Sequence, residues 1–275
     1  MPRTPDVRPP AVGGMFYPAE PEVLRDEISG YLEDAERKPI KGNIRGLIVP
    51  HAGYLYSGGT AAYGYALLEG SKYKTVVVIS PSHREYFEGA TVYPGTAYRT
   101  PLGQININQR LREELVKTST VVAINDAGHR DEHAIEVQLP FLQQVLPEFS
   151  LLPLVIGKQS REICFELGDA LGTILAGEDA LLVASTDLSH YYAVAMANQL
   201  DAVMIRDVKQ FDFEQLMNDL EGGKTEACGG GPTVAVMRAA RMLGATRAEI
   251  LRYSNSGDIT GDHRSVVGYL CAVLF

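Results

Sequence analysis

The sequence has too few cysteines, in the wrong arrangement, for a disulfide framework. Its three cysteines, Cys164, Cys228 and Cys271, cannot all pair with one another, and none of them forms a C-x-x-C motif. This pattern suits a reducing compartment better than the secretory route. The first residues contain no apolar segment of the kind found in signal peptides. We therefore expect a cytoplasmic protein.

Long apolar runs and clusters of positive charge are also missing. No stretch approaches the roughly 18 apolar residues that a membrane-spanning helix needs. The chain has 25 lysines and arginines against 34 acidic residues, which gives a formal charge of −9, and it contains no basic run. Nucleic acid and membranes are therefore not expected as partners.

The composition is that of an ordinary globular protein. Of its 275 residues, 45% are hydrophobic and 21% are charged, so the chain can bury a large core without disulfides. It shows no internal repeat, low-complexity tract or linker. We expect one domain over residues 1–275, with residues 1–21 as an extended N-terminal arm, because six of those residues are proline.

Short apolar segments, rich in β-branched residues, alternate with helical patterns. Buried strands are expected at 45–49, 75–80, 150–156 and 180–185. Two later strands are expected at 249–257 and 265–275, the second of them antiparallel. Helices are expected at 22–38, 57–69, 108–118, 132–146, 160–176, 191–209 and 232–243. This alternation predicts an α/β fold, a three-layer α/β/α sandwich with a mostly parallel mixed sheet.

Histidines follow three of the predicted strands at the point where each strand ends. His51 follows the first strand, His83 follows the second, and Asp187 and His190 follow the strand at 180–185. Because the carboxyl ends of parallel strands meet at one edge, we expect the three imidazoles within roughly 12 Å of one another. Each histidine alone is most simply a surface loop residue. Together they indicate a site for a transition metal.

The segment 129–146 carries further polar residues. Asp131 and Glu132 are explained most simply as the acidic start of the predicted helix. His133 and Glu136 are three residues apart, so they are expected on one helical face. We interpret this segment as support for the site or as a substrate contact.

Cys228 stands directly before three glycines and Pro232, at the start of a predicted helix. Glycine N–H groups at such a place form a cup that favours anions, and a thiol there is expected to have a lowered pKa. Cys164 and Cys271 lie inside apolar periodic runs and are expected in the core. Cys228 is therefore the candidate ligand or nucleophile.

The combination of these motifs resembles the MEMO family, called the AmmeMemoRadiSam system protein B group in prokaryotes. The matching stretches are PHAGYLYSGGTAA, SPSH, DEHAIEVQLPFL, STDLSHY, CGGGP and VVGYLCAVLF. MEMO proteins resemble class III extradiol dioxygenases in fold, and those enzymes hold Fe(II) with two histidines and a glutamate. The MEMO family has two histidines and a cysteine instead. The resemblance implies His51, His83 and Cys228 as metal ligands.

The resemblance also implies roles for neighbouring residues. It places His190 at the position of the dioxygenases' acid–base histidine, with Asp187 beside it, and it makes His133 a further imidazole of the pocket. Fe²⁺ is the metal that the dioxygenase likeness implies, whereas a His₂Cys set also suits copper or zinc. Because a cysteine replaces the carboxylate ligand, ring cleavage is not implied.

Three functions are compatible with these residues. The first is a metal-dependent redox enzyme. The second is a non-enzymatic adaptor whose pocket binds a phosphorylated or otherwise anionic small molecule or peptide. The third is metal-free catalysis, with Cys228 as nucleophile and His51 or His190 as base. The prokaryotic name of the family further implies a pathway shared with radical-SAM and AMMECR-type proteins.

Overall fold

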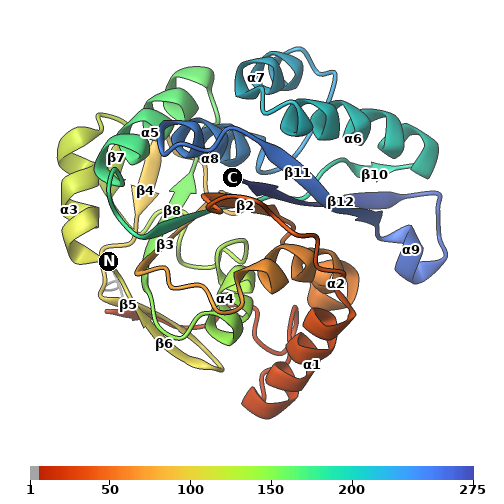
Figure 1. The fold of residues 1–275 in the computed structure, drawn as a ribbon, viewed down its shortest axis with the longest axis horizontal. Helices are drawn as coiled ribbons and strands as arrows, with labels where there is room; N and C mark the ends of the chain where they lie inside the picture. Colours follow the sequence, from red (N-terminus) through yellow and green to blue (C-terminus); the bar gives the residue numbers. More distant parts are fainter. Residues whose placement is uncertain (1–5) are drawn as a thin grey trace.

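The fold is organised around one nine-stranded mixed sheet (Figure 1). The computed structural model describes residues 6–275. The four central strands, in the order β2, β9, β3 and β8, are parallel to one another. On one side β12 pairs with β2 in the antiparallel direction, and β10 and β11 pair with β12 in the same way. On the other side β4 is antiparallel to β8. At the far edge β7 pairs in parallel with β4. The strands are β2 (Gly46–Val49), β3 (Thr75–Pro81), β4 (Ala90–Val92), β7 (Val122–Ile124), β8 (Ser150–Ile156), β9 (Ala180–Ser185), β10 (His190–Tyr192), β11 (Ala248–Asn255) and β12 (Val266–Leu274).

Helices cover both faces of this sheet, which confirms the predicted α/β sandwich (Figure 1). Alternate side chains of β3 show why. Val76 and Val78 pack into the core on one face, and Val77 and Ile79 pack into the core on the other. One face carries α3 (Gln109–Thr118), α5 (Arg161–Ile174), α6 (Val194–Lys209), α7 (Phe213–Glu221) and α8 (Gly230–Met242). The other carries α1 (Pro21–Asp34), α2 (Tyr54–Tyr65) and α4 (Leu139–Val145).

The N-terminal arm belongs to a second, three-stranded sheet. Its strand β1 (Val7–Arg8) pairs with β5 (Ala97–Thr100), which pairs with β6 (Gly103–Asn106). The arm was predicted for residues 1–21, of which 1–5 lie outside the described residues. From residue 6 to residue 20 it contains β1 and turns but no helix, as its prolines require.

The helix expected at 132–146 is shorter than predicted. The structure has a 3₁₀ turn at Glu136–Gln138, and α4 begins only at Leu139. Pro140 gives the reason, because inside a longer helix it would lose a hydrogen bond and collide with the carbonyl of Glu136. In the first turn of α4 Pro140 breaks no hydrogen bond of the helix, because the N–H groups there have no partner within the helix. Residues 129–135 therefore form an irregular loop.

Some elements were not predicted. They are α7, the short strands β4, β5, β6, β7 and β10, and the short helix α9 (Gly257–Thr260). Within residues 6–275 there is no helix with the length and apolar character needed to cross a bilayer.

Replacing Ile79 by alanine should lower the free energy of unfolding by about 2–5 kcal/mol, because this side chain is fully buried beneath the helices. Ile259→Ala is the matched control, since that side chain is 52% exposed, and its effect should stay within about 0.5 kcal/mol. Urea denaturation measures both. Equal losses in the two variants would contradict the placement of β3 in the core.

Candidate metal centre

The structure brings His51, His83 and Cys228 together at the carboxyl edge of the parallel strands. His51 follows β2, His83 follows β3, and Cys228 lies just before α8. The ring centroids of His51 and His83 are 5.1 Å apart, and Nε2 of His51 lies 3.1 Å from Sγ of Cys228. One ring nitrogen of each histidine and the sulfur all lie within 4.8 Å of one another. These are the three ligands that the resemblance implies.

His133 adds a further imidazole to this cluster. Its ring stacks on His83 with a centroid distance of 4.9 Å and an interplanar angle of 23°. It also lies 5.4 Å from the ring of His51. Its Nδ1 is buried and lies 3.3 Å from Oε1 of Glu132, but without hydrogen-bond geometry. Among residues 6–275 this nitrogen has no hydrogen-bond partner.

A hydrogen-bond relay decides which nitrogen of His51 carries hydrogen. The hydroxyl of Tyr65 donates to Oε1 of Gln138 at 2.7 Å, so the amide nitrogen of Gln138 faces Ser185 and donates to its Oγ at 2.8 Å. The Ser185 hydroxyl uses its only hydrogen on the carbonyl of Ala134, at 2.6 Å. Nδ1 of His51 lies 3.0 Å from the same Oγ and must therefore be the donor. This assigns the tautomer in which Nε2 keeps a free lone pair.

His51 is also held neutral. Burial, reinforced by the neighbouring imidazole of His83, lowers the pKa of His51 to about 3. The lone pair on Nε2, which faces Cys228, is therefore unprotonated at physiological pH. Ser185 and Gln138, which prepare this state, were not singled out from the sequence, although Ser185 ends a predicted strand.

Glu132 orients the second histidine. Its Oε1 accepts hydrogen bonds from Nδ1 of His83 at 2.9 Å and from the N–H groups of His133 and Ala134. Its Oε2 accepts from the N–H of His83 at 2.6 Å. Burial works to raise the pKa of Glu132, but the hydrogen bonds and charge of His83 outweigh it and lower the pKa to about 2. The carboxylate thus stays ionised and holds Nδ1 of His83 as a donor, which leaves Nε2 for the cluster.

A second group, His83, Glu132 and His133, also has potential ligand atoms within 4.8 Å of one another. The oxygens of Glu132 already accept from four N–H groups, those of the His83 ring and of the backbone at 83, 133 and 134. A carboxylate occupied in this way supports ligands rather than acting as one. The interpretation of Asp131 and Glu132 as a helix start is wrong, because the loop is not helical. The other interpretation of this segment, as support for the site, agrees with the bonds from His83 to Glu132.

Glu136 does not join His133 at the cluster, although the two were expected on one helical face. They lie in one turn, in which the N–H of Val137 donates to the carbonyl of His133, but their side chains have different partners. The carboxylate of Glu136 points instead into the N-terminal arm, where it accepts from the side chain of Arg8 and from the N–H groups of Ala11 and Val12.

The expected anion cup beside Cys228 is also absent from the described structure, because all three glycine N–H groups have protein partners. These bonds are Gly229 to Oγ1 of Thr186, Gly230 to the carbonyl of Ala227, and Gly231 to Oε1 of Gln159. Gly229 is needed for packing. A Cβ at this position would lie 2.3 Å from the carbonyl oxygen of Ser185, so the loop that carries Cys228 approaches β9 directly.

The predicted lowering of the Cys228 pKa is wrong for the protein without metal. Burial and the charge of the neighbouring Asp187 carboxylate raise the pKa of Cys228 well above its usual range. The N–H of Asp187 points at the sulfur, with a distance of 3.3 Å. The side chain is therefore a neutral thiol beside the lone pair of His51.

Asp187 and His190 occupy the same edge of the sheet but play different parts. Asp187 is buried, and its Oδ1 accepts from the backbone N–H of His51 at 2.7 Å. Burial raises its pKa. His190 is half-buried on β10, and its backbone N–H donates to Oε1 of Glu226 at 3.0 Å. No hydrogen bond within residues 6–275 joins the imidazole of His190 to Asp187, and that ring does not stack on the other three.

Comparison with known proteins identifies the family of this chain. The family model described as "Memo-like protein" matches residues 8–273. The chain belongs to this family. A MEMO1 family protein of Methanosarcina barkeri is 39% identical over 271 residues, which are 98% of this chain and 100% of the relative. A MEMO1 family protein of Aquifex aeolicus is 38% identical, with coverages of 96% and 97%. The MEMO resemblance read from the sequence is thus confirmed.

A solved structure supports the fold alone. The uncharacterized protein JW3007 from Escherichia coli K12 aligns with a TM-score of 0.57 over 83% of this Memo-like chain and 99% of its own. The two sequences are only 18% identical, so nothing about ligands or activity follows from this likeness.

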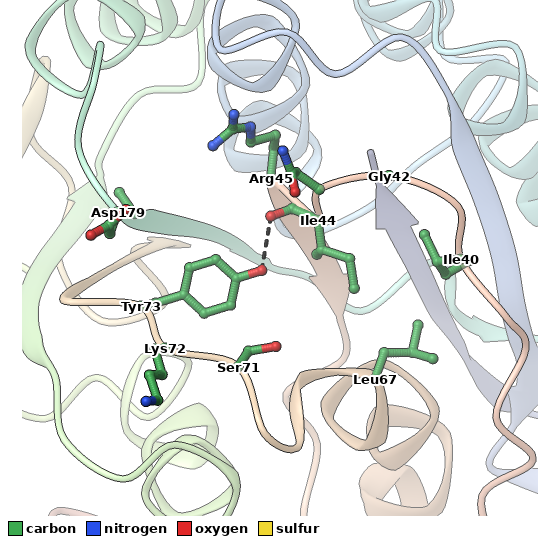
Figure 2. A pocket seen from close by; sticks show the side chains of 11 residues that line it. Ile40, Gly42, Ile44, Arg45, Leu67, Ser71, Lys72, Tyr73 and Asp179 are labelled. Carbon is green, nitrogen blue, oxygen red and sulfur yellow. Dashed lines mark hydrogen bonds between the residues drawn. The ribbon is translucent and has the colours of Figure 1, made fainter.

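A pocket of about 510 Å³ lies at the opposite end of the parallel strands of the Memo-like fold (Figure 2). It is lined by Arg45, which precedes β2, by Ala180 at the start of β9, and by Tyr73, whose hydroxyl donates to the carbonyl of Ile44 at 2.9 Å. Figure 2 shows Arg45 and Lys72 on opposite sides of the Tyr73 ring, so their charges do not converge. The candidate metal ligands do not line this pocket.

The neutral imidazoles make the stability of the Memo-like chain depend on pH. The folded pKa values of His51 and His129 are about 3 and that of His133 is about 4, below the ordinary value of about 6.5, so the unfolded chain binds more protons between these limits. The stability that these imidazoles contribute is therefore fully present above pH 6.5 and is lost as the pH falls. Each imidazole should contribute a loss of about 2 kcal/mol between pH 7.5 and pH 5.

His51→Asn should reduce that loss by about 2 kcal/mol, because it removes one of the three buried neutral imidazoles. The measurement is urea denaturation at both pH values in the presence of a chelator. His263→Asn, which changes an exposed histidine, serves as control and should keep the wild-type loss. An unchanged loss in His51→Asn would show that His51 is not held neutral by the fold.

Proposed function

We propose that this Memo-like protein is a metal-dependent oxidoreductase, related in fold to the extradiol dioxygenases. Its metal is Fe²⁺ foremost, with copper or zinc as alternatives, and its ligands are His51, His83 and Cys228. One observation carries the proposal: the lone pair of His51 Nε2 faces the sulfur of Cys228, 3.1 Å away, while Nδ1 of the same ring already donates to Ser185. Metal-binding histidines are characteristically oriented in this way through their second nitrogen.

The donor set fits such a metal. His83 is oriented through its Nδ1 by Glu132, as His51 is by Ser185, and two imidazoles with a thiolate suit first-row transition ions. When bound, the metal supplies a Lewis acid and a redox centre at the sheet edge. Its charge also offsets the cost of ionising Cys228, whose pKa is otherwise raised by burial and by Asp187.

Other side chains at this edge provide proton transfer and substrate contacts. We assign proton transfer to His190, which is half-buried and lies outside the ligand cluster. Asp187 holds the backbone of His51 and is buried beside the site. The unpartnered Nδ1 of His133 offers a hydrogen bond to a bound molecule. The substrate we propose is a small molecule or a peptide side chain.

The two competing functions have weaker support. An anionic or phosphorylated ligand needs positive charge or free N–H groups, but the lowered pKa values keep His51 and His133 neutral and the glycine N–H groups beside Cys228 have partners. A metal-free nucleophile needs a thiolate, but the pKa of Cys228 is raised. The cytoplasmic location and the link to radical-SAM and AMMECR-type proteins are proposals that rest on cysteine usage and on the family resemblance.

The proposal is tested by metal analysis of protein purified without oxygen. The wild-type chain should bind about one first-row metal ion, and iron should give an electron paramagnetic resonance signal with nitric oxide. Cys228→Ser should weaken metal binding by at least about tenfold, because the sulfur ligand is lost. Cys164→Ser, which changes a core cysteine, should retain wild-type affinity. Equal affinity in both variants would remove Cys228 from the ligand set.

His190→Ala separates the ligands from the proton-transfer group. Since His190 lies outside the cluster, this variant should keep metal stoichiometry and affinity within about twofold of wild type, whereas His83→Ala should lose at least about tenfold in affinity. Titration with zinc and a chromophoric chelator measures both. Loss of metal in His190→Ala would make His190 a ligand in place of one of the three.

A further inference from the structure

We propose that Arg8, in the N-terminal arm, is a positioning residue of the metal centre. Its guanidinium holds the 129–135 loop and the side chain of Glu136, which follows the loop. This loop places Glu132 where it orients His83. The metal readout described below depends on the proposed function, whereas the positioning itself does not.

The guanidinium of Arg8 contacts three points of one short loop. Nε donates to the carbonyl of His129 at 2.9 Å, Nη2 donates to the carbonyl of Glu132, and Nη1 pairs with the carboxylate of Glu136. Arg8 is only 1% exposed and Glu136 is fully buried. A buried arginine whose donors all end on one segment fixes the conformation of that segment.

The first part of the loop depends on Arg8 for partners of its carbonyl groups. Residues 129–135 contain no helix or strand. The carbonyls of His133, Ala134 and Ile135 accept from other residues, whereas those of His129 and Glu132 accept from Arg8. Glu132 lies at the centre of the loop. Its backbone carbonyl is held by Arg8, while its carboxylate holds both the ring and the backbone N–H of His83. One residue thus links the arm directly to a proposed metal ligand.

The arm contacts the cluster at a second place. The ring of Phe16 lies 4.8 Å from the ring of His133, and the carbonyl of Phe16 accepts from the N–H of Tyr54, the first residue of α2. That helix begins three residues after His51. The arm therefore touches the loop that carries His133 and the first residue of the helix that follows His51, and Arg8 is its charged anchor.

The choice of variants follows from the chemistry of the pair. Removing Arg8 alone leaves Glu136 buried and unpaired, which threatens folding as a whole. Arg8→Met/Glu136→Gln removes both charges. Its one amide oxygen can keep the bonds from Val12 and Tyr17, while the N–H of Ala11, which donates to the other carboxylate oxygen, loses its acceptor. Arg8→Lys keeps the ion pair, but a single ammonium cannot reach three separate acceptors. Arg238→Met/Asp169→Asn is the control for removal of an Arg–carboxylate pair elsewhere, since this partly exposed two-bond pair joins α8 to α5 away from the site.

Hydrogen exchange of the metal-free protein, kept in chelator, is the first measurement. The backbone N–H groups of His83, His133 and Ala134 all donate to the carboxylate of Glu132. They should exchange at least about tenfold faster in Arg8→Met/Glu136→Gln and in Arg8→Lys, while the amides of α5 and α8 keep wild-type rates. The control variant should leave the three site amides unchanged. Unaltered site amides, or equal acceleration throughout the chain, would overturn the proposal.

Cobalt(II) binding is the second measurement, with the metal ion alone as probe. Both Arg8 variants should bind Co²⁺ about 10–100-fold more weakly than wild type and show altered visible absorption bands, because the orientation of His83 is lost. Wild-type affinity and spectrum in both variants would contradict the positioning role. Failure of the wild-type chain to bind Co²⁺ counts against the proposed function, and the exchange rates then decide on Arg8 by themselves.

Discussion

A single hydroxyl hydrogen, that of Ser185, determines the chemical state of the site. Because it is donated to the carbonyl of Ala134, Oγ can only accept, and both Gln138 and His51 donate to it. Gln138 also donates to the carbonyl of Pro50, directly before His51. The end of β9, the 129–135 loop and the end of β2 are thereby tied to one atom, and the Nε2 lone pair of His51 is a consequence of that bond.

The two histidines of the cluster are held by different acceptors. Nδ1 of His51 donates to a neutral hydroxyl, whereas Nδ1 of His83 donates to a buried carboxylate whose pKa is lowered to about 2. A carboxylate withdraws the N–H hydrogen more strongly and makes the far nitrogen more basic. The two imidazoles are therefore unequal donors, and His83 is the stronger one.

The parts of the fold and site that could be predicted from the sequence are those with a local signal. Strands buried on both faces show continuous apolar runs, and the carboxyl-edge rule for parallel strands placed His51 and His83 together. Cys228 stood out because it lies outside any apolar periodicity. The roles of Glu132, Glu136 and Arg8 have no such signal, because each depends on hydrogen bonds between distant segments. Arg8 and Glu136 are 128 residues apart, so no spacing rule along the chain connects them.

The spacing of the three proposed ligands along the chain has a consequence for how the protein acquires metal. His51 and His83 are 83 − 51 = 32 residues apart, and Cys228 follows 228 − 83 = 145 residues later. An unfolded chain seldom brings such distant groups together, because closing long loops costs entropy. Unlike a zinc finger, this chain has no local pair of ligands among the three with which a metal ion could nucleate folding. The proposed metal ion would therefore bind to a sheet that is already assembled, so the folded protein would form before it acquires the ion.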